Sequence, residues 1–108
     1  MSEVPALSPV ELKSELESGA NLLLLDVREA DELEISSLPG IIHIPLGEIE
    51  DRYSEIPKDR DVVVICRTGG RSGRTTEFLL NHGYKRVRNM ATGMNGYATT
   101  VDQTMKTY

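Results

Sequence analysis

Two short apolar runs with no polar face constrain the fold of this chain more than any other feature. They are Leu22–Leu25 and Val62–Ile65, four residues each, and the second is β-branched throughout. A strand with one face in water alternates apolar and polar residues, whereas unbroken runs of this length are typical of strands buried on both faces. Segments with helical features separate the expected strands, and no connection is a tight hairpin. The pattern predicts an α/β domain with a mainly parallel central sheet.

The other expected elements follow from start and stop residues. Ser8, Pro9 and Glu11 provide the cap, first-turn proline and third-position glutamate of a helix start, and Gly19 provides a stop. Further helices are expected at about 29–33, 47–54, 72–82 and 93–101, and further strands at about 41–44 and 86–90. With 108 residues and no internal repeat or linker, the chain is expected to form a single domain, residues 1–108.

The composition argues against several classes of protein. Hydrophobic residues make up 39% and charged residues 27%, which is a globular balance, and apolar runs of four residues are too short to span a bilayer. The first residues lack the basic and apolar segments of a secretory signal. The single cysteine excludes an internal disulfide, so a reducing, cytoplasmic location is expected.

Charge is unevenly distributed along the chain. Residues 1–61 hold 15 acidic and 5 basic side chains and residues 62–108 hold 2 and 7, so the halves carry −10 and +5 within a net charge of −5. This balance disfavours nucleic acid, which needs a clustered surplus of Lys and Arg. Most of the acids are explained as solvated helix faces. An anionic ligand, if one binds, is expected at the second half.

Cys66 directly follows the second apolar run. Open α/β sheets gather their sites at the carboxyl ends of strands, where a loop leads into a helix whose amides point back at the ligand. Two glycines in this loop allow successive N–H groups to converge on one sulfur, and Arg67, Arg71 and Arg74 add positive charge. Such surroundings lower the pKa of a thiol. The alternative, a small buried core cysteine, fits less well because Arg-Thr-Gly-Gly-Arg-Ser cannot continue a core.

Three motifs in this order resemble the single-domain, rhodanese-like sulfurtransferase family. Residues 66–72, Cys-Arg-Thr-Gly-Gly-Arg-Ser, are similar to its active loop. Residues 25–29, Leu-Asp-Val-Arg-Glu, are similar to its first-strand signature, and residues 38–46, Leu-Pro-Gly-Ile-Ile-His-Ile-Pro-Leu, to its proline-bounded second strand. The resemblance covers a core from about residue 8 to about residue 102.

The resemblance implies a rhodanese-like fold, with about five parallel strands and helices on both faces. It also implies a reaction in which Cys66 takes sulfur from a donor such as thiosulfate, forms a persulfide and passes the sulfur to a nucleophilic acceptor. The implied partners are a small anionic sulfur donor and an external thiol, cyanide or protein acceptor, with no cofactor, nucleic acid or membrane. The implied donor-binding residues are the rest of the loop: Arg67, Thr68, Gly69, Gly70, Arg71 and Ser72.

Several residues outside the loop are candidates for supporting roles. Asp26 is expected to hydrogen-bond loop amides at the end of its strand, and Arg28 either pairs with a carboxylate or helps to hold the active face. His43 and His82 are far from Cys66 in sequence and are given no role. No cluster of side chains has metal-ligand spacing, so no metal is expected.

Two other functions are open alternatives. Cysteine phosphatases and arsenate reductases also hold an anion in a loop, but their loops resemble Cys-x5-Arg, whereas Arg71 stands one position too early. The shorter ring suits a sulfur atom better than a tetrahedral phosphate. The other alternative is a non-enzymatic interaction module, since fold does not fix function. The presence of Cys66 ranks this module last.

Overall fold

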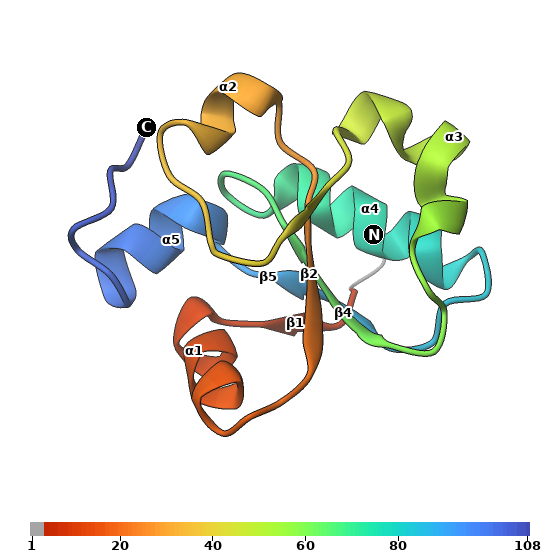
Figure 1. Ribbon diagram of the computed structural model, residues 1–108, viewed down its shortest axis with the longest axis horizontal. Helices are drawn as coiled ribbons and strands as arrows, with labels where there is room; N and C mark the ends of the chain where they lie inside the picture. Colours follow the sequence, from red (N-terminus) through yellow and green to blue (C-terminus); the bar gives the residue numbers. More distant parts are fainter. Residues whose placement is uncertain (1–3) are drawn as a thin grey trace.

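A five-stranded parallel sheet runs through the computed structural model, which describes residues 4–108 (Figure 1). The strands are β1 (Ala6–Leu7), β2 (Leu22–Asp26), β3 (Ile42–His43), β4 (Asp61–Ile65) and β5 (Val87–Met90). They lie in the order β1-β5-β4-β2-β3, and every pairing between neighbours is parallel. The predicted α/β fold and its five-stranded parallel sheet are therefore confirmed.

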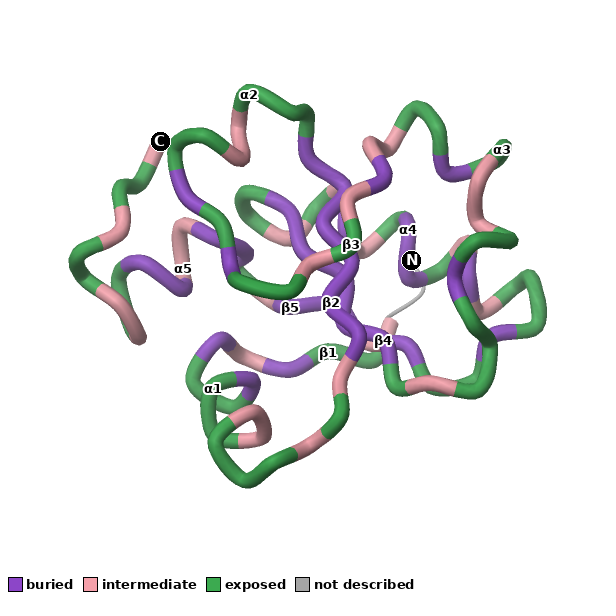
Figure 2. Tube along the Cα trace, viewed as in Figure 1, coloured by how far each residue is buried: buried purple, intermediate pink, exposed green. Residues whose placement is uncertain are grey.

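The two apolar runs form the neighbouring central strands β2 and β4. Leu23–Leu25 and Val62–Ile65 are each at most 5% exposed, as expected for strands covered on both faces (Figure 2). The register pairs Asp26 with Ile65, and the Val27 amide donates to the Ile65 carbonyl at 3.0 Å. Because the pair is parallel, both strands end at the same edge of the sheet, where the following loops meet.

Strand β1 is an element that the sequence does not predict. Two residues are too few to show a period, so nothing distinguishes them from a loop. In the fold, Leu7 pairs with Met90 of β5, and the Asn89 amide donates to the Pro5 carbonyl at 2.8 Å. Both edge strands, β1 and β3, are two residues long.

Helices cover both faces of the sheet (Figure 1). They are α1 (Pro9–Glu17), α2 (Ala30–Leu33), α3 (Ile49–Arg52), α4 (Gly70–Leu80) and α5 (Gly93–Thr100). One apolar cluster joins the sheet to α3 and α4 through Ile49 and Leu79, and the other joins it to α1 and α5 through Leu12 and Met94. The predicted two-sided arrangement is confirmed. None of the helices within residues 4–108 has the length and apolar character needed to cross a membrane.

The helix boundaries agree with the expected ones to different degrees. At α1 the Ser8 hydroxyl accepts from the Glu11 amide at 3.1 Å, and Glu11 Oε1 accepts from the Ser8 amide at 2.8 Å, so the predicted capping box is present. The helix predicted at 47–54 is confirmed in position, but only α3 in its middle is α-helical, and the turns on either side, Leu46–Glu48 and Tyr53–Glu55, are 3-10 helices. Helix α4 begins at Gly70, earlier than the predicted residue 72.

Candidate active site

Cys66 lies directly after β4, inside the turn that leads into α4. The residue is 1% exposed and its thiol is free. Its sulfur accepts hydrogen bonds from the Gly69 amide at 3.1 Å and from the Ser72 hydroxyl at 3.2 Å. The loop therefore folds over its own cysteine, with polar hydrogens directed at the sulfur.

The tight turn depends on one of the two loop glycines. Gly69 has a φ of 105°, in the left-handed region that side chains rarely adopt. A Cβ at Gly69 would also lie 3.3 Å from the Thr92 amide nitrogen. Gly70 has no positive φ, and a Cβ there would meet nothing within 4 Å. The conformational freedom predicted for both glycines is therefore needed only at Gly69.

Opposing influences set the pKa of Cys66. Burial is the largest single influence and raises the pKa, because it disfavours the charged thiolate. Hydrogen bonds from the Ser72 hydroxyl and from the backbone amides of Ser72, Gly69 and Thr68 lower the pKa, and together they outweigh burial. The 11-residue helix α4 begins at the loop and directs the positive end of its dipole toward it. The site therefore favours the thiolate more than an ordinary cysteine environment does.

Asn89, a buried residue of β5, braces the loop at two points. Its Nδ2 donates to the Gly69 carbonyl at 3.1 Å, and its Oδ1 accepts from the Ser72 hydroxyl at 2.5 Å. A hydroxyl has a single proton, so Ser72 donates to Asn89 or to the Cys66 sulfur, but not to both at once. Sequence reasoning missed Asn89. The available signal was an amide side chain within an expected buried strand, where it needs hydrogen-bond partners.

The start of α5 holds the other side of the loop. The Met94 amide donates to the Cys66 carbonyl at 2.8 Å, and the Asn95 amide donates to the Arg67 carbonyl at 3.0 Å. Gly93 makes this approach possible, because it has a φ of 62° and a Cβ there would lie 2.4 Å from the carbonyl carbon and oxygen of Arg67. The cysteine loop is therefore held between α4, β5 and α5.

The two arginines expected to attract an anionic donor both have partners within the chain. Arg71 donates from Nη1 and Nη2 to the two carboxylate oxygens of Glu32, at 2.7 and 2.9 Å. The Arg67 guanidinium lies 5.0 Å from the centroid of the Tyr108 ring, a distance typical of a cation–π contact. Hydrogen bonding to Arg71 is the main reason that the pKa of Glu32 falls to about 2. The acidic partner of Arg71 comes from α2, which sequence proximity could not show.

Asp26 and Arg28 form a fully buried ion pair beside the site. Both side chains are 0% exposed, and Arg28 Nη2 lies 2.8 Å from Asp26 Oδ2. The Arg28 amide donates to Asp26 Oδ1 at 3.0 Å, which is the loop-amide bond expected of Asp26. Nη2 of Arg28 also donates to the Ser36 carbonyl at 2.8 Å, and Nη1 donates to the Tyr108 hydroxyl at 3.0 Å. Pairing with a carboxylate, one of the two roles open for Arg28, is present in the structure.

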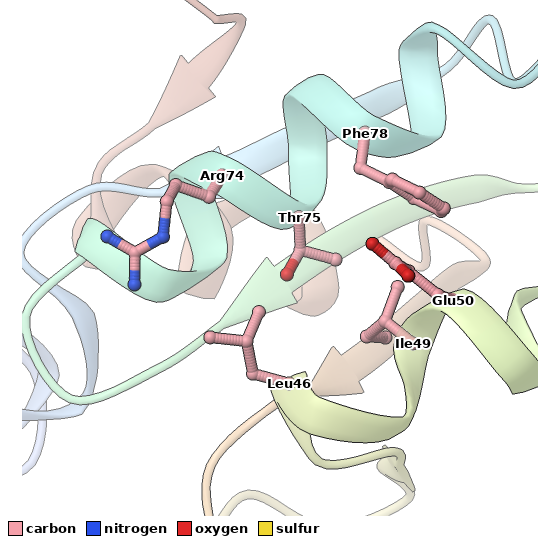
Figure 3. Close-up of a pocket in the computed structure, with 6 residues that line it drawn as sticks. All are labelled: Leu46, Ile49, Glu50, Arg74, Thr75 and Phe78. Carbon is pink, nitrogen blue, oxygen red and sulfur yellow. The ribbon is translucent and has the colours of Figure 1, made fainter.

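The hydrogen bonds to the sulfur come from other groups than the remaining candidates, Arg74, His43 and His82. Arg74 borders a cavity of about 240 Å³ between α4 and residues 46–50, which include the start of α3, and Cys66 is not among the lining residues. The cavity is lined by Leu46, Ile49, Glu50, Arg74, Thr75 and Phe78 (Figure 3). His43 and His82 bond to main-chain carbonyl oxygens, at 2.6 and 2.7 Å. Within residues 4–108, no three His, Cys, Asp or Glu side chains gather in a way that could hold a metal ion.

Two curated relatives resemble most of this chain. A sulfurtransferase of Allochromatium vinosum is 39% identical over 87 residues, which cover 81% of each chain. YrkF of Bacillus subtilis, a candidate sulfur carrier protein, is 36% identical over 96 residues, which cover 89% of this chain and 52% of YrkF. The chain therefore spans most of the first relative and about half of the second.

Structural similarity and a family model agree with these relatives. The structure of CoADR-RHD from Bacillus anthracis matches with a TM-score of 0.83 and 34% identity, over 97% of this chain and 18% of that one. The model of the rhodanese-like domain family matches residues 8–100. That range includes the cysteine loop, the helices that hold the loop, and every strand of the sheet except β1. The chain therefore belongs to the rhodanese-like family of sulfurtransferase domains.

Proposed function

We propose that this chain transfers sulfur through a persulfide on Cys66. The observation that carries the proposal is the set of donors around the sulfur, with the Gly69 amide at 3.1 Å and the Ser72 hydroxyl at 3.2 Å at the start of α4. The thiolate is the nucleophilic form of cysteine, and these donors stabilise negative charge at the position where it must form.

The proposed reaction consists of two displacements on sulfur. The Cys66 thiolate attacks the outer sulfur of a donor such as thiosulfate, the S–S bond of the donor breaks, and its electron pair leaves with sulfite. An acceptor then attacks the outer sulfur of the persulfide, and the electron pair of that S–S bond returns to Cys66 as a thiolate. A thiol, cyanide or a protein thiol can serve as the acceptor. Each step exchanges one bond to sulfur for another, so no external oxidant or reductant is needed.

The proposed donor-binding residues are those of the loop, Arg67 to Ser72. Because Cys66 is only 1% exposed, the approach to its sulfur is narrow and suits a donor that presents a small terminal sulfur atom. Backbone amides and the start of α4 would then stabilise the charge on the outer sulfur of the persulfide. The proposal includes a reducing compartment such as the cytoplasm, which keeps Cys66 as a free thiol between turnovers.

Phosphate chemistry has less support. A transferring phosphoryl group spreads its charge over three oxygens and needs cations and amides around all of them. Arg71 is the cation that would face a phosphoryl group in this loop, but its guanidinium makes two hydrogen bonds to Glu32. We therefore expect no hydrolysis of aryl phosphates that depends on Cys66.

Intact-mass spectrometry tests the proposed function. Wild-type protein treated with thiosulfate, or with another sulfane donor, and then freed of donor should carry the added mass of one sulfur atom per chain. Cyanide or a small thiol should return it to the starting mass. Cys66→Ser should gain nothing while keeping its far-ultraviolet circular dichroism, and wild-type protein alkylated at Cys66 provides a second control. Failure of every sulfane donor to add sulfur to Cys66 would refute the proposal.

A further inference from the structure

Glu32 is the centre of a cluster at the rim of the cysteine loop. Both of its carboxylate oxygens accept from Arg71, at 2.7 and 2.9 Å, and its Oε1 also accepts from the Glu29 amide at 3.0 Å. The Glu32 side chain is 15% exposed and that of Arg71 is 27% exposed. Partial removal from water strengthens such a pair relative to a pair on the open surface. The side of the Arg71 guanidinium that bears both Nη groups is therefore occupied before any donor arrives.

Tyr108 completes the cluster from the other end of the chain. Its hydroxyl donates to Glu32 Oε2 at 2.6 Å and accepts from Arg28 Nη1 at 3.0 Å. Its backbone is held by the side chain of Asn95, which accepts from the Tyr108 amide at 3.0 Å and donates to its carbonyl at 3.2 Å. Figure 1 shows this end of the chain beside α2.

The ring of Tyr108 engages the second arginine of the loop. The Arg67 guanidinium lies 5.0 Å from the ring centroid. Burial is the main influence that raises the pKa of the Tyr108 hydroxyl, so the hydroxyl stays protonated and keeps donating to Glu32 at neutral pH. One carboxylate and one phenol thus engage both arginines that the loop offers to an anion.

This arrangement opposes donors that carry two negative charges. Thiosulfate would have to displace Glu32 from Arg71 or approach a carboxylate of its own sign. The sulfur group of an alkyl persulfide carries at most one negative charge, and its reactive protonated form, R–S–S–H, needs no free guanidinium. The Cys66 thiolate attacks its outer sulfur, the S–S bond breaks, its electron pair leaves on R–S⁻, and the proton stays on the new persulfide of Cys66.

We propose that Glu32 and Tyr108 determine donor specificity, by slowing the reaction of Cys66 with doubly charged donors such as thiosulfate relative to its reaction with small alkyl persulfides. This inference rests on the proposed function of Cys66 as the sulfur acceptor. Glu32 acts by holding Arg71, and Tyr108 acts by holding Glu32 and covering Arg67. Both are positioning residues, since neither contacts the sulfur of Cys66 in the structure.

The test compares the second-order rate constants for loading Cys66 with thiosulfate and with cysteine persulfide. Loading is measured by rapid quenching and intact-mass analysis. Wild type should load faster with cysteine persulfide. Glu32→Gln should raise the rate constant for thiosulfate about tenfold, since a charge-assisted hydrogen-bonded pair is worth roughly one decade in rate. The same change should leave the rate constant for cysteine persulfide within about twofold of the wild-type value. Tyr108→Phe should raise the thiosulfate constant about threefold, because one hydrogen bond to the carboxylate is lost.

The matched control is Asp31→Asn, which removes one negative charge from the exposed side of the same helix, α2. It should leave the ratio of the two rate constants unchanged. An unchanged ratio in Glu32→Gln, or an equal rise for both donors, would overturn the inference while leaving the sulfur transfer intact. If the effects of Glu32→Gln and Tyr108→Phe on the thiosulfate rate constant add in the double variant, then Tyr108 does not act through Glu32. If neither donor loads wild-type Cys66, the proposed function itself fails.

Discussion

Replacing Gly93 with alanine should loosen the cysteine loop without touching any group that reacts. The added Cβ would lie 2.4 Å from the Arg67 carbonyl carbon and oxygen and 2.5 Å from the Cys66 carbonyl oxygen, so the backbone of α5 must move away. The position also has a φ of 62°, which disfavours any residue with a side chain. The Met94–Cys66 and Asn95–Arg67 backbone hydrogen bonds span this contact and would break or lengthen.

The size of the effect can be summed from these contacts. The left-handed conformation costs a side chain roughly 1–2 kcal/mol. The two backbone hydrogen bonds contribute about 1 kcal/mol each. We therefore expect Gly93→Ala to lower the free energy of unfolding by about 3–4 kcal/mol, the sum of these terms, or by more if the clash is not relieved.

Urea denaturation followed by circular dichroism measures this loss. Gly47→Ala is the matched control, because Gly47 has no positive φ and a Cβ there would meet nothing within 4 Å. It should stay within about 1 kcal/mol of wild type, allowing for the general effect of replacing glycine. The rate of Cys66 alkylation by iodoacetamide provides a local readout and should change in Gly93→Ala alone. A Gly93→Ala protein as stable as the Gly47→Ala protein, with wild-type alkylation, would refute this account of how the loop is held.

Three further predictions concern the groups around the loop. Ser72→Ala should raise the pKa of Cys66, because the hydrogen bond from the Ser72 hydroxyl to the sulfur is lost, and a thiolate absorbance titration that matches wild type would contradict this. The stabilising effect of Glu32 should be complete above its ordinary pKa of 4.5 and be lost as the pH falls toward about 2, since its pKa is lowered in the fold. Wild type and Glu32→Gln should therefore differ in unfolding free energy at pH 7 and converge near pH 2, and a difference independent of pH would exclude the ion pair as its cause. Arg28→Leu should cost about 3–5 kcal/mol of stability by leaving the buried Asp26 carboxylate unpaired, whereas a loss below about 1 kcal/mol in urea would show that the pair is dispensable.

Local patterns in the sequence were sufficient to predict the elements that carry the loop. The apolar runs Leu22–Leu25 and Val62–Ile65 predict buried strands because burial on both faces leaves no room for polar residues. Cys66 follows the second run, so the position of the sulfur at the edge of the sheet follows from the order of elements alone.

The partners of the loop could not be predicted in this way, because they come from distant parts of the chain. Glu32 lies 39 residues before Arg71, and the Tyr108 hydroxyl meets Glu32 across 76 residues. Asn89 of β5 donates to the Gly69 carbonyl of the loop across 20 residues of sequence. Such contacts depend on how the elements pack, and no local period or cap encodes them. The expectation of a free positive patch on the loop arose from counting charges near Cys66, which leaves out carboxylates that the fold brings back to it.

The short edge strands have a consequence for how this protein behaves at high concentration. A sheet recruits foreign chains through the unpaired N–H and carbonyl groups of its outermost strands, and long flat edges promote fibre formation. Here β1 and β3 each present two residues. The run Val62–Ile65, with the composition of a cross-β segment, is instead paired by β2 along its whole length and by β5 over residues 62–64. The segment most prone to intermolecular pairing therefore becomes available only when the sheet opens, so aggregation should follow global unfolding rather than occur from the native state.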